Sequence, residues 1–206
     1  PSAKAWTAGG RERMATQART AGAVVLYALA GAAALLLLFG AYCGFSHTKW
    51  ALFDHGMYTN ALWNAGHGNG FRYLVDRDYL TTHLSFSLAL VGLLFHVWDS
   101  TLLPMAVQWL AFCGGGLCIF LSCRRHRLSH VETAAVLFFH AFWPLTQSVL
   151  LSSFHGIAMI FLLLPWLYHT CSFSRRWAPL PLALLLALRE DAFVYALPIL
   201  LYVAIR

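Results

Sequence analysis

Four long stretches of the chain are almost free of charged side chains, and this feature most limits the folds open to it. They run over residues 22–44, 101–123, 131–151 and 157–173, and Glu132 is the one charged residue among them. A helix needs about 20 apolar residues to cross roughly 30 Å of hydrocarbon, where every backbone polar group must be paired internally. Because 60% of the 206 residues are hydrophobic and 11% are charged, the sequence predicts an all-α, polytopic transmembrane helical bundle.

The positive charges gather in short clusters between these stretches. They are Lys4, Arg11, Arg13 and Arg19 before the first stretch, Arg124, Arg125 and Arg127 after the second, and Arg175 and Arg176 after the fourth. This arrangement, without an exposed basic face or interleaved aromatic residues, argues against a nucleic-acid partner despite a net charge of +6. The positive-inside rule instead predicts that all three clusters are cytoplasmic. We therefore expect residues 1–21 to be a cytoplasmic N-terminal segment.

The apolar residues 84–98 decide how the chain is threaded. They are only 15 in number, or about 22 Å as a helix. If they crossed the membrane, the cluster at Arg124 would lie outside. If they lie in the interface, all three clusters lie inside. We therefore expect spans at 22–44, 101–123, 131–151 and 157–173, with an exterior loop at 45–100 that carries interfacial helices. The chain begins at Pro1 and ends at Arg206 within apolar sequence, so we expect it to be a fragment.

The exterior loop contains Asp54 at the start of an amphipathic helix predicted over residues 54–65. A carboxylate facing a membrane-lined pocket can act as a general base or as a metal ligand. Asp is also a preferred residue at a helix N-terminus, where it has a purely structural role. His83 in the same loop and His155 on the next exterior turn likewise leave two interpretations open, contact with a phosphate or metal and anchoring of a loop.

The triplet Arg189-Glu190-Asp191 interrupts the apolar segment 178–206. Ionisable groups at membrane depth are costly, so such a cluster predicts a functional site. Residues 178–188 are too few to cross a bilayer, and we expect segment 178–206 to be broken or folded back as a hairpin, with the triplet in a wet cavity open to the exterior. The structural alternative is an internal salt bridge. Neighbours on a helix point to different faces, so one compact bridge is not expected to satisfy all three residues.

Five short sequence segments together resemble the prokaryotic membrane-protein family catalogued as domain of unknown function 2079. The resemblance lies in Phe53-Asp54-His55-Gly56, Asn60-Ala61-Leu62-Trp63, Thr82-His83-Leu84, Phe154-His155-Gly156 and Arg189-Glu190-Asp191. Four positions depart from the family pattern: Asn60 replaces Gln, Thr82 replaces Asp, Gly156 replaces Pro and Arg189 replaces Lys. Thr82 puts an acidic contact in doubt, and Arg189 keeps the charge of Lys without its geometry. Members of the family are generally longer, so the resemblance implies that this chain is an N-terminal portion.

The family in turn is similar to the GT-C glycosyltransferase superfamily, which uses polyprenyl-phosphate sugars. This resemblance implies a GT-C-like fold in a prokaryotic plasma membrane, with a lipid-linked sugar donor entering from membrane lipid. It implies that Asp54 is catalytic, activating an acceptor or binding a divalent cation. The substrate-binding residues that it implies are His83, His155, Arg189, Glu190, Asp191 and Asn60.

Two other functions fit the residues. A transporter or channel subunit would use the charged triplet as an intramembrane substrate or proton site. A non-catalytic membrane assembly subunit would use none of these residues chemically.

Overall fold

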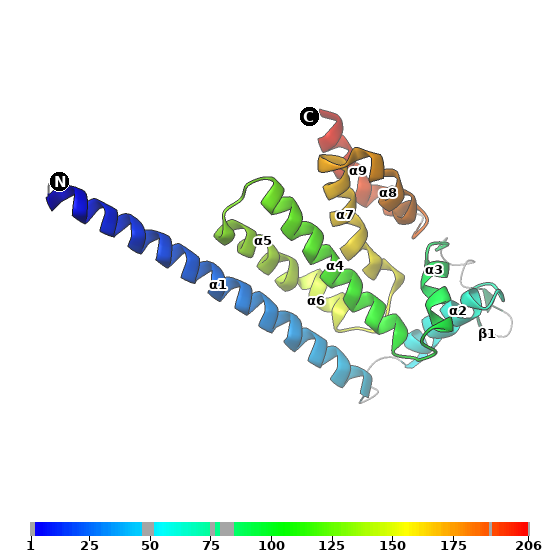
Figure 1. Cartoon of the computed structure of the whole chain (residues 1–206). Helices are drawn as coiled ribbons and strands as arrows, with labels where there is room; N and C mark the ends of the chain where they lie inside the picture. Colours follow the sequence, from blue (N-terminus) through cyan, green and yellow to red (C-terminus); the bar gives the residue numbers. More distant parts are fainter. Residues whose placement is uncertain (1–2, 47–51, 75–76, 79–84, 190, 206) are drawn as a thin grey trace.

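Apolar helices form the body of the structure, and a small unit with the only described strands lies at one end (Figure 1). The computed structural model describes residues 3–46, 52–74, 77–78, 85–189 and 191–205. The prediction of an all-helical membrane bundle is confirmed. The hairpin of β1 (Arg72–Leu74) and β2 (Arg77–Asp78) was not predicted, because two or three residues are too few to show a period of two.

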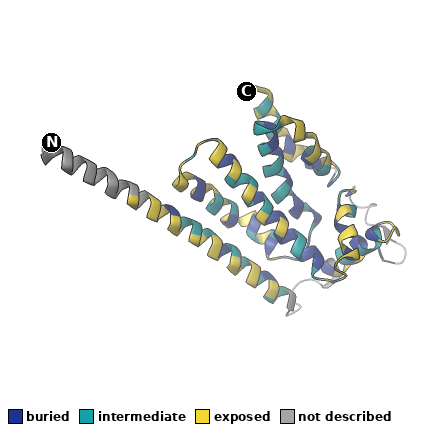
Figure 2. Cartoon of the chain, in the orientation of Figure 1, coloured by how far each residue is buried: buried dark blue, intermediate teal, exposed yellow. Residues whose placement is uncertain are grey.

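Three described segments are long and apolar enough to cross a membrane. They are Thr20–Gly44 within α1 (Ala3–Ser46), Leu103–Arg125, which is α4, and Gly156–Phe173, which contains the 3-10 turn η3 (Gly156–Met159) and α7 (Ile160–Phe173). α1 extends past the rest of the bundle at its N-terminal end (Figure 1). Its side chains at Leu35, Leu36 and Phe39 are exposed (Figure 2), as expected for a helix whose apolar surface meets lipid.

The stretch predicted as one span at 131–151 consists of two helices. α5 (His130–Phe142) and α6 (Pro144–Leu150) are bent by 52° where they meet at Trp143. The residue before a proline is pushed out of the helical region, and Trp143 has an extended ψ of 127°. Together the two helices are apolar enough to make a fourth span.

The last segment folds back on itself. α8 (Pro179–Leu186) follows the 3-10 turn η4 (Arg175–Trp177), and α9 (Ala192–Ile205) follows α8. Both helices pack on α7. Near the end of α9, the ring of Tyr202 lies 6.0 Å from the ring of Tyr168, near the end of α7. α9 therefore returns to the end at which α8 begins.

The bundle thus has two chemically different ends. We call the end with Arg124, Arg125, Arg175 and Arg176 the arginine end. The opposite end, where α4 begins and α6 leads into η3, we call the loop end. It carries a unit made of α2 (Leu52–Gly66), the hairpin, α3 (Leu88–Gly92) and η2 (Leu93–His96). α2 and α3 approach closely because both have glycine at the crossing, and a Cβ on Gly66 would lie 2.1 Å from the carbonyl oxygen of Gly92.

One hydrophobic core joins this unit to the bundle. Its fully buried members come from α2, α3, the turn before η3, α7 and the end of α8, and include Leu62, Leu88, Phe154, Leu167 and Leu188. Burial of such a side chain stabilises a fold by about 1.5–3 kcal/mol. The loop-end unit is therefore held against the bundle by apolar packing.

Candidate functional site at the loop end

One face of α2 packs on the turn that leads into η3. The Tyr58 ring meets the buried Phe154 ring edge to face, with centroids 5.7 Å apart, and the His155 ring at 5.4 Å. Asp54 lies one helical turn before Tyr58 in α2. The backbone therefore places the predicted catalytic residue in the first turn of α2, the helix whose Tyr58 meets His155.

The hydrogen bonds of His155 fix its ring chemistry. Nδ1 lies 2.7 Å from the carbonyl oxygen of Ser153. A carbonyl oxygen can only accept, so Nδ1 carries the proton and the neutral ring has its lone pair on Nε2. The backbone N–H of His155 donates to Oε1 of Gln108 at 3.4 Å, and the fully buried Gln108 amide donates to the Val149 carbonyl oxygen. The packed interior thus orients a half-buried histidine.

The break between α8 and α9 holds an ion pair. Nε of Arg189 donates to Oδ1 of Asp191 at 3.0 Å. The pair is one of the two salt bridges that the structural alternative allowed for Arg189, which lies outside both helices. Whether one bridge satisfies all three residues of the triplet stays a prediction, because Glu190 lies outside the described residues. Since Nε makes this bond, the terminal nitrogens Nη1 and Nη2 remain as donors, and no residue within the described ranges accepts from them.

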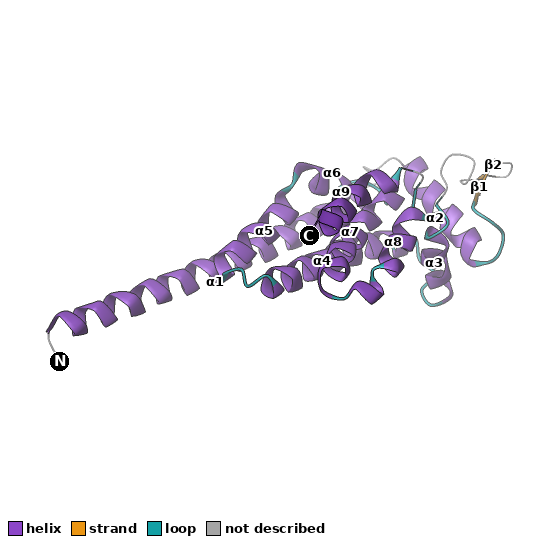
Figure 3. Cartoon of the chain, turned by 90° about the horizontal axis from the view of Figure 1, so that it is seen from above, coloured by secondary structure: helices purple, strands orange, loops and turns teal. Residues whose placement is uncertain are grey.

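Two contacts bring this break to the first loop. The backbone N–H of Ser87 donates to the carbonyl oxygen of Ala187 at 3.0 Å, and the end of α8 lies near α3 in two views (Figures 1 and 3). Leu88 packs on Gly156, where an added Cβ would lie 2.8 Å from Leu88 Cδ1. The start of α3, the start of η3 and the α8–α9 break therefore meet at the loop end.

Buried hydroxyl groups lie at this junction. Oγ of Ser85 and Oγ of Ser87 are inaccessible to solvent and have no hydrogen-bond partner within the part of the chain that the structure describes. An unpaired buried hydroxyl costs free energy. A polar ligand at the junction would give these groups a partner.

A model of the family described as "Predicted membrane protein (DUF2079)" matches residues 47–206. The chain belongs to the DUF2079 family of predicted membrane proteins. The DUF2079 match covers α2 to α9, and it includes Asp54, His155 and the Arg189–Asp191 pair. No curated protein and no solved structure matches the chain.

Within this DUF2079 chain, the structure brings together some of the predicted site residues. His155, Arg189 and Asp191 all lie at the loop end. His83 and Glu190 lie outside the described residues. Asn60 lies on the opposite face of α2 from Tyr58, where Nδ2 donates to the Tyr73 carbonyl oxygen at 2.8 Å and Oδ1 accepts from Asn64. These bonds hold the chain after α2.

That opposite face of α2 lines a pocket of about 400 Å³. The lining residues are His55, Gly56, Thr59, Asn60 and Trp63 from α2, with Phe95, Asp99, Ser100 and Thr101. His55 Nε2 lies 2.9 Å from the Thr101 carbonyl oxygen and therefore donates to it. Burial lowers the pKa of His55, and this hydrogen bond partly opposes the shift. Aromatic rings beside amide, hydroxyl and carboxylate groups suit a small polar molecule.

Sequence reasoning missed Tyr58, Gln108 and this pocket. The four-residue spacing of Asp54 and Tyr58, and of His55, Thr59 and Trp63, was the available signal. Gln108 gave a weaker signal, because it is a lone amide side chain in an apolar span. For a divalent cation, the described residues contain no group of three or more His, Cys, Asp or Glu side chains that could hold a metal ion. No step below depends on a cation.

Proposed function

We propose that this DUF2079 chain is part of a GT-C-like glycosyltransferase that transfers a sugar from a polyprenyl-phosphate donor to an acceptor at the loop end. One observation carries the proposal. An oriented histidine, an arginine whose two terminal nitrogens have no acceptor within the described ranges, and the helix that starts near Asp54 all lie at the end of the bundle opposite the arginine end. Cationic donors beside an acid are what transfer from a phosphate-linked sugar requires.

The charge distribution supports an exterior position for this site. Basic clusters favour the cytoplasm, which would place the arginine end inside and the loop end outside. The N-terminus of α1 would then be cytoplasmic, and the protein would be a multi-pass protein of a prokaryotic plasma membrane. A donor carried by membrane lipid would reach the site from the side.

In the proposed step, the Asp54 carboxylate takes the proton of an acceptor hydroxyl, and the hydroxyl oxygen attacks the anomeric carbon. The bond between that carbon and the phosphate oxygen breaks, and polyprenyl phosphate leaves with the electron pair. Nη1 and Nη2 of Arg189 would bind the phosphate oxygens while Asp191 holds Nε. The imidazole of His155, held through Nδ1 by the Ser153 carbonyl oxygen, would contact the donor beside Arg189.

The remaining predicted residues have supporting roles in this proposal. His83 would contact the phosphate, and Glu190 would orient the cations or the acceptor. Asn60 would act on substrate only indirectly, through the fold of the segment that follows α2. A divalent cation at Asp54 stays a prediction.

The test uses the full chain in proteoliposomes with labelled polyprenyl-phosphate hexoses and pentoses. The proposal predicts release of polyprenyl phosphate together with transfer of the sugar to a component of the producing cell's envelope. Absence of polyprenyl phosphate release with every donor, while the protein is inserted and folded, would contradict it.

A transporter or channel subunit is the second candidate, favoured by the folded-back α8–α9 segment with an ion pair at its break. Broken helices with charged groups are typical of transport sites. A flux assay in the same proteoliposomes separates the two functions, because solute movement without sugar transfer would favour transport.

A further inference from the structure

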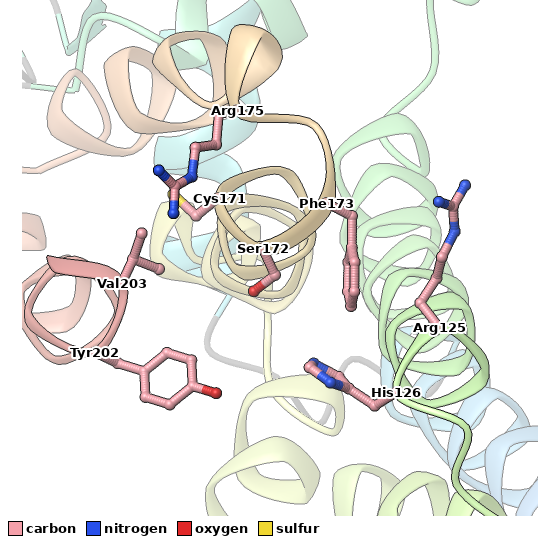
Figure 4. Close-up of a pocket in the computed structure, with 8 residues that line it drawn as sticks. All are labelled: Arg125, His126, Cys171, Ser172, Phe173, Arg175, Tyr202 and Val203. Carbon is pink, nitrogen blue, oxygen red and sulfur yellow. The ribbon is translucent and has the colours of Figure 1, made fainter. Parts of the chain in front are cut away.

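A second pocket lies at the arginine end, far from the site described above. It has a volume of about 450 Å³ and lies where four elements end (Figure 4). Its lining comes from the end of α4, the end of α7, η4 and the last turns of α9, and consists of Arg125, His126, Cys171, Ser172, Phe173, Arg175, Tyr202 and Val203. Residues from distant parts of the sequence therefore build one cavity.

Polar groups converge inside it. The side chains of Ser172, Tyr202 and His126 point toward a common space (Figure 4). Oγ of Ser172 is buried and has no hydrogen-bond partner in the described part of the chain. His126 Nε2 lies 2.9 Å from the hydroxyl oxygen of Tyr168, which fixes the position of the imidazole. Hydroxyl and imidazole groups can all donate to an oxygen-rich ligand.

The charges around the pocket have one sign. Arg125 and Arg175 lie on opposite sides of it (Figure 4), and none of the described residues that line it is Asp or Glu. The guanidinium of Arg125 lies 6.0 Å from the centre of the Phe173 ring. Neither arginine forms an ion pair with a carboxylate within the described ranges. Glu132, the described acid of the α4–α5 turn region, is bonded instead to the backbone N–H and Oγ of Ser129.

The pocket also adjoins an apolar surface. Leu201 and Ile205, on the last turns of α9, are exposed beside Tyr202. A ligand with a polar head in the pocket can therefore extend an apolar tail along α9 toward lipid.

We propose that this pocket binds a phosphate group, with the head group of an anionic membrane lipid as its source. Guanidinium groups match phosphate oxygens, and basic pockets between helix ends on the cytoplasmic side bind anionic head groups. Ser172 supplies a buried donor that has no other partner in the described structure. This inference does not depend on the sugar-transfer proposal.

The test measures binding of three probes to the purified full chain in neutral detergent, by native mass spectrometry and thermal unfolding. The probes are phosphatidylglycerol, phosphatidylcholine and inorganic phosphate. Phosphatidylglycerol should bind and raise the unfolding temperature, whereas phosphatidylcholine should not. If inorganic phosphate at equal concentration displaces phosphatidylglycerol, the pocket binds soluble phosphate instead of a lipid. The phosphate-binding chemistry is the same in both cases.

Two variants and one matched control locate the binding. Arg175→Gln should weaken phosphatidylglycerol binding about fivefold. Ser172→Ala should also weaken it without lowering the unfolding temperature of the lipid-free protein, because it removes an unpaired hydroxyl. Arg176→Gln removes the same charge one residue away, where the guanidinium lies over Trp177, and should leave binding unchanged. Equal effects of Arg175→Gln and Arg176→Gln, or no effect of Ser172→Ala, would overturn the proposal.

Discussion

The ring of Tyr58 in α2 lies 5.4 Å from the ring of His155 in the turn before η3, at an interplanar angle of 59°. The same tyrosine ring packs on the fully buried Phe154. Tyr58 thus connects the helix that starts near Asp54 to the histidine whose tautomer is fixed by Ser153. One contact region therefore determines both how the first loop lies against the bundle and how the proposed site is arranged.

Tyr58→Ala should therefore lower both stability and sugar transfer. Removing this half-buried ring is expected to cost about 2–4 kcal/mol of unfolding free energy, measured by denaturant unfolding in detergent. Tyr58→Phe keeps the ring contacts and is the control for packing. If alanine and phenylalanine have the same stability, the contact with Phe154 and His155 does not hold α2 in place.

Gly115→Ala tests the crossing of α4 and α7. A Cβ at Gly115 would lie 1.8 Å from the carbonyl oxygen of Phe161, so the helices would have to separate. The expected loss is about 1–3 kcal/mol or more. Gly116→Ala is the control, since its Cβ would meet only His140 at an ordinary 3.8 Å. Thermal unfolding should separate the two variants, and equal unfolding temperatures would argue against this crossing.

His55 should make the stability of the protein depend on pH. Burial lowers its pKa in the folded state, so the unfolded chain binds more protons at mildly acidic pH. The contribution of His55 to the free energy of unfolding is complete above its unfolded-state pKa of about 6.5. It is lost as the pH falls toward the lower pKa of the folded state. His55→Gln, which can still donate to Thr101, should flatten the fall in unfolding temperature between pH 7.5 and 5.5. A profile of His55→Gln identical to that of the unchanged protein would contradict this assignment.

The Arg189–Asp191 pair should matter more for transfer than for folding. With side chains 27% and 41% exposed, such a pair contributes about 0–1 kcal/mol. Asp191→Asn should therefore change stability little and reduce transfer, because Arg189 would lose the group that orients it. Arg189→Lys keeps the positive charge without the two-nitrogen geometry, and it should retain part of the activity. Full activity of Asp191→Asn would remove the pair from the mechanism.

Much of the fold could be predicted from the sequence because membrane helices need long apolar stretches. Pro144 could also have predicted the bend at Trp143, because a proline restrains the backbone of the residue before it. Residues 131–151 were nevertheless predicted as one span. The fold-back of α8 and α9 was expected because residues 178–188 are too few to cross a bilayer.

The site was less predictable, since its contacts join segments that are distant in sequence. Nothing local to Tyr58 or Gln108 indicates that each would contact His155. The sequence left two partners open for Arg189, and the structure pairs it with Asp191 across the break between two helices. In the sequence, Arg125 and Arg175 indicated only the membrane topology. The pocket between them forms because α4 and α7 run parallel.

If Asp54 supplies the base for sugar transfer at the loop end, Asp54→Asn should release polyprenyl phosphate from a labelled polyprenyl-phosphate sugar more slowly than the unchanged chain does in proteoliposomes. Loss of a general base typically lowers the rate by about 10²–10⁴-fold, and we expect such a loss with unchanged insertion and unfolding temperature. Release at the unchanged rate would contradict the role of Asp54 as the base.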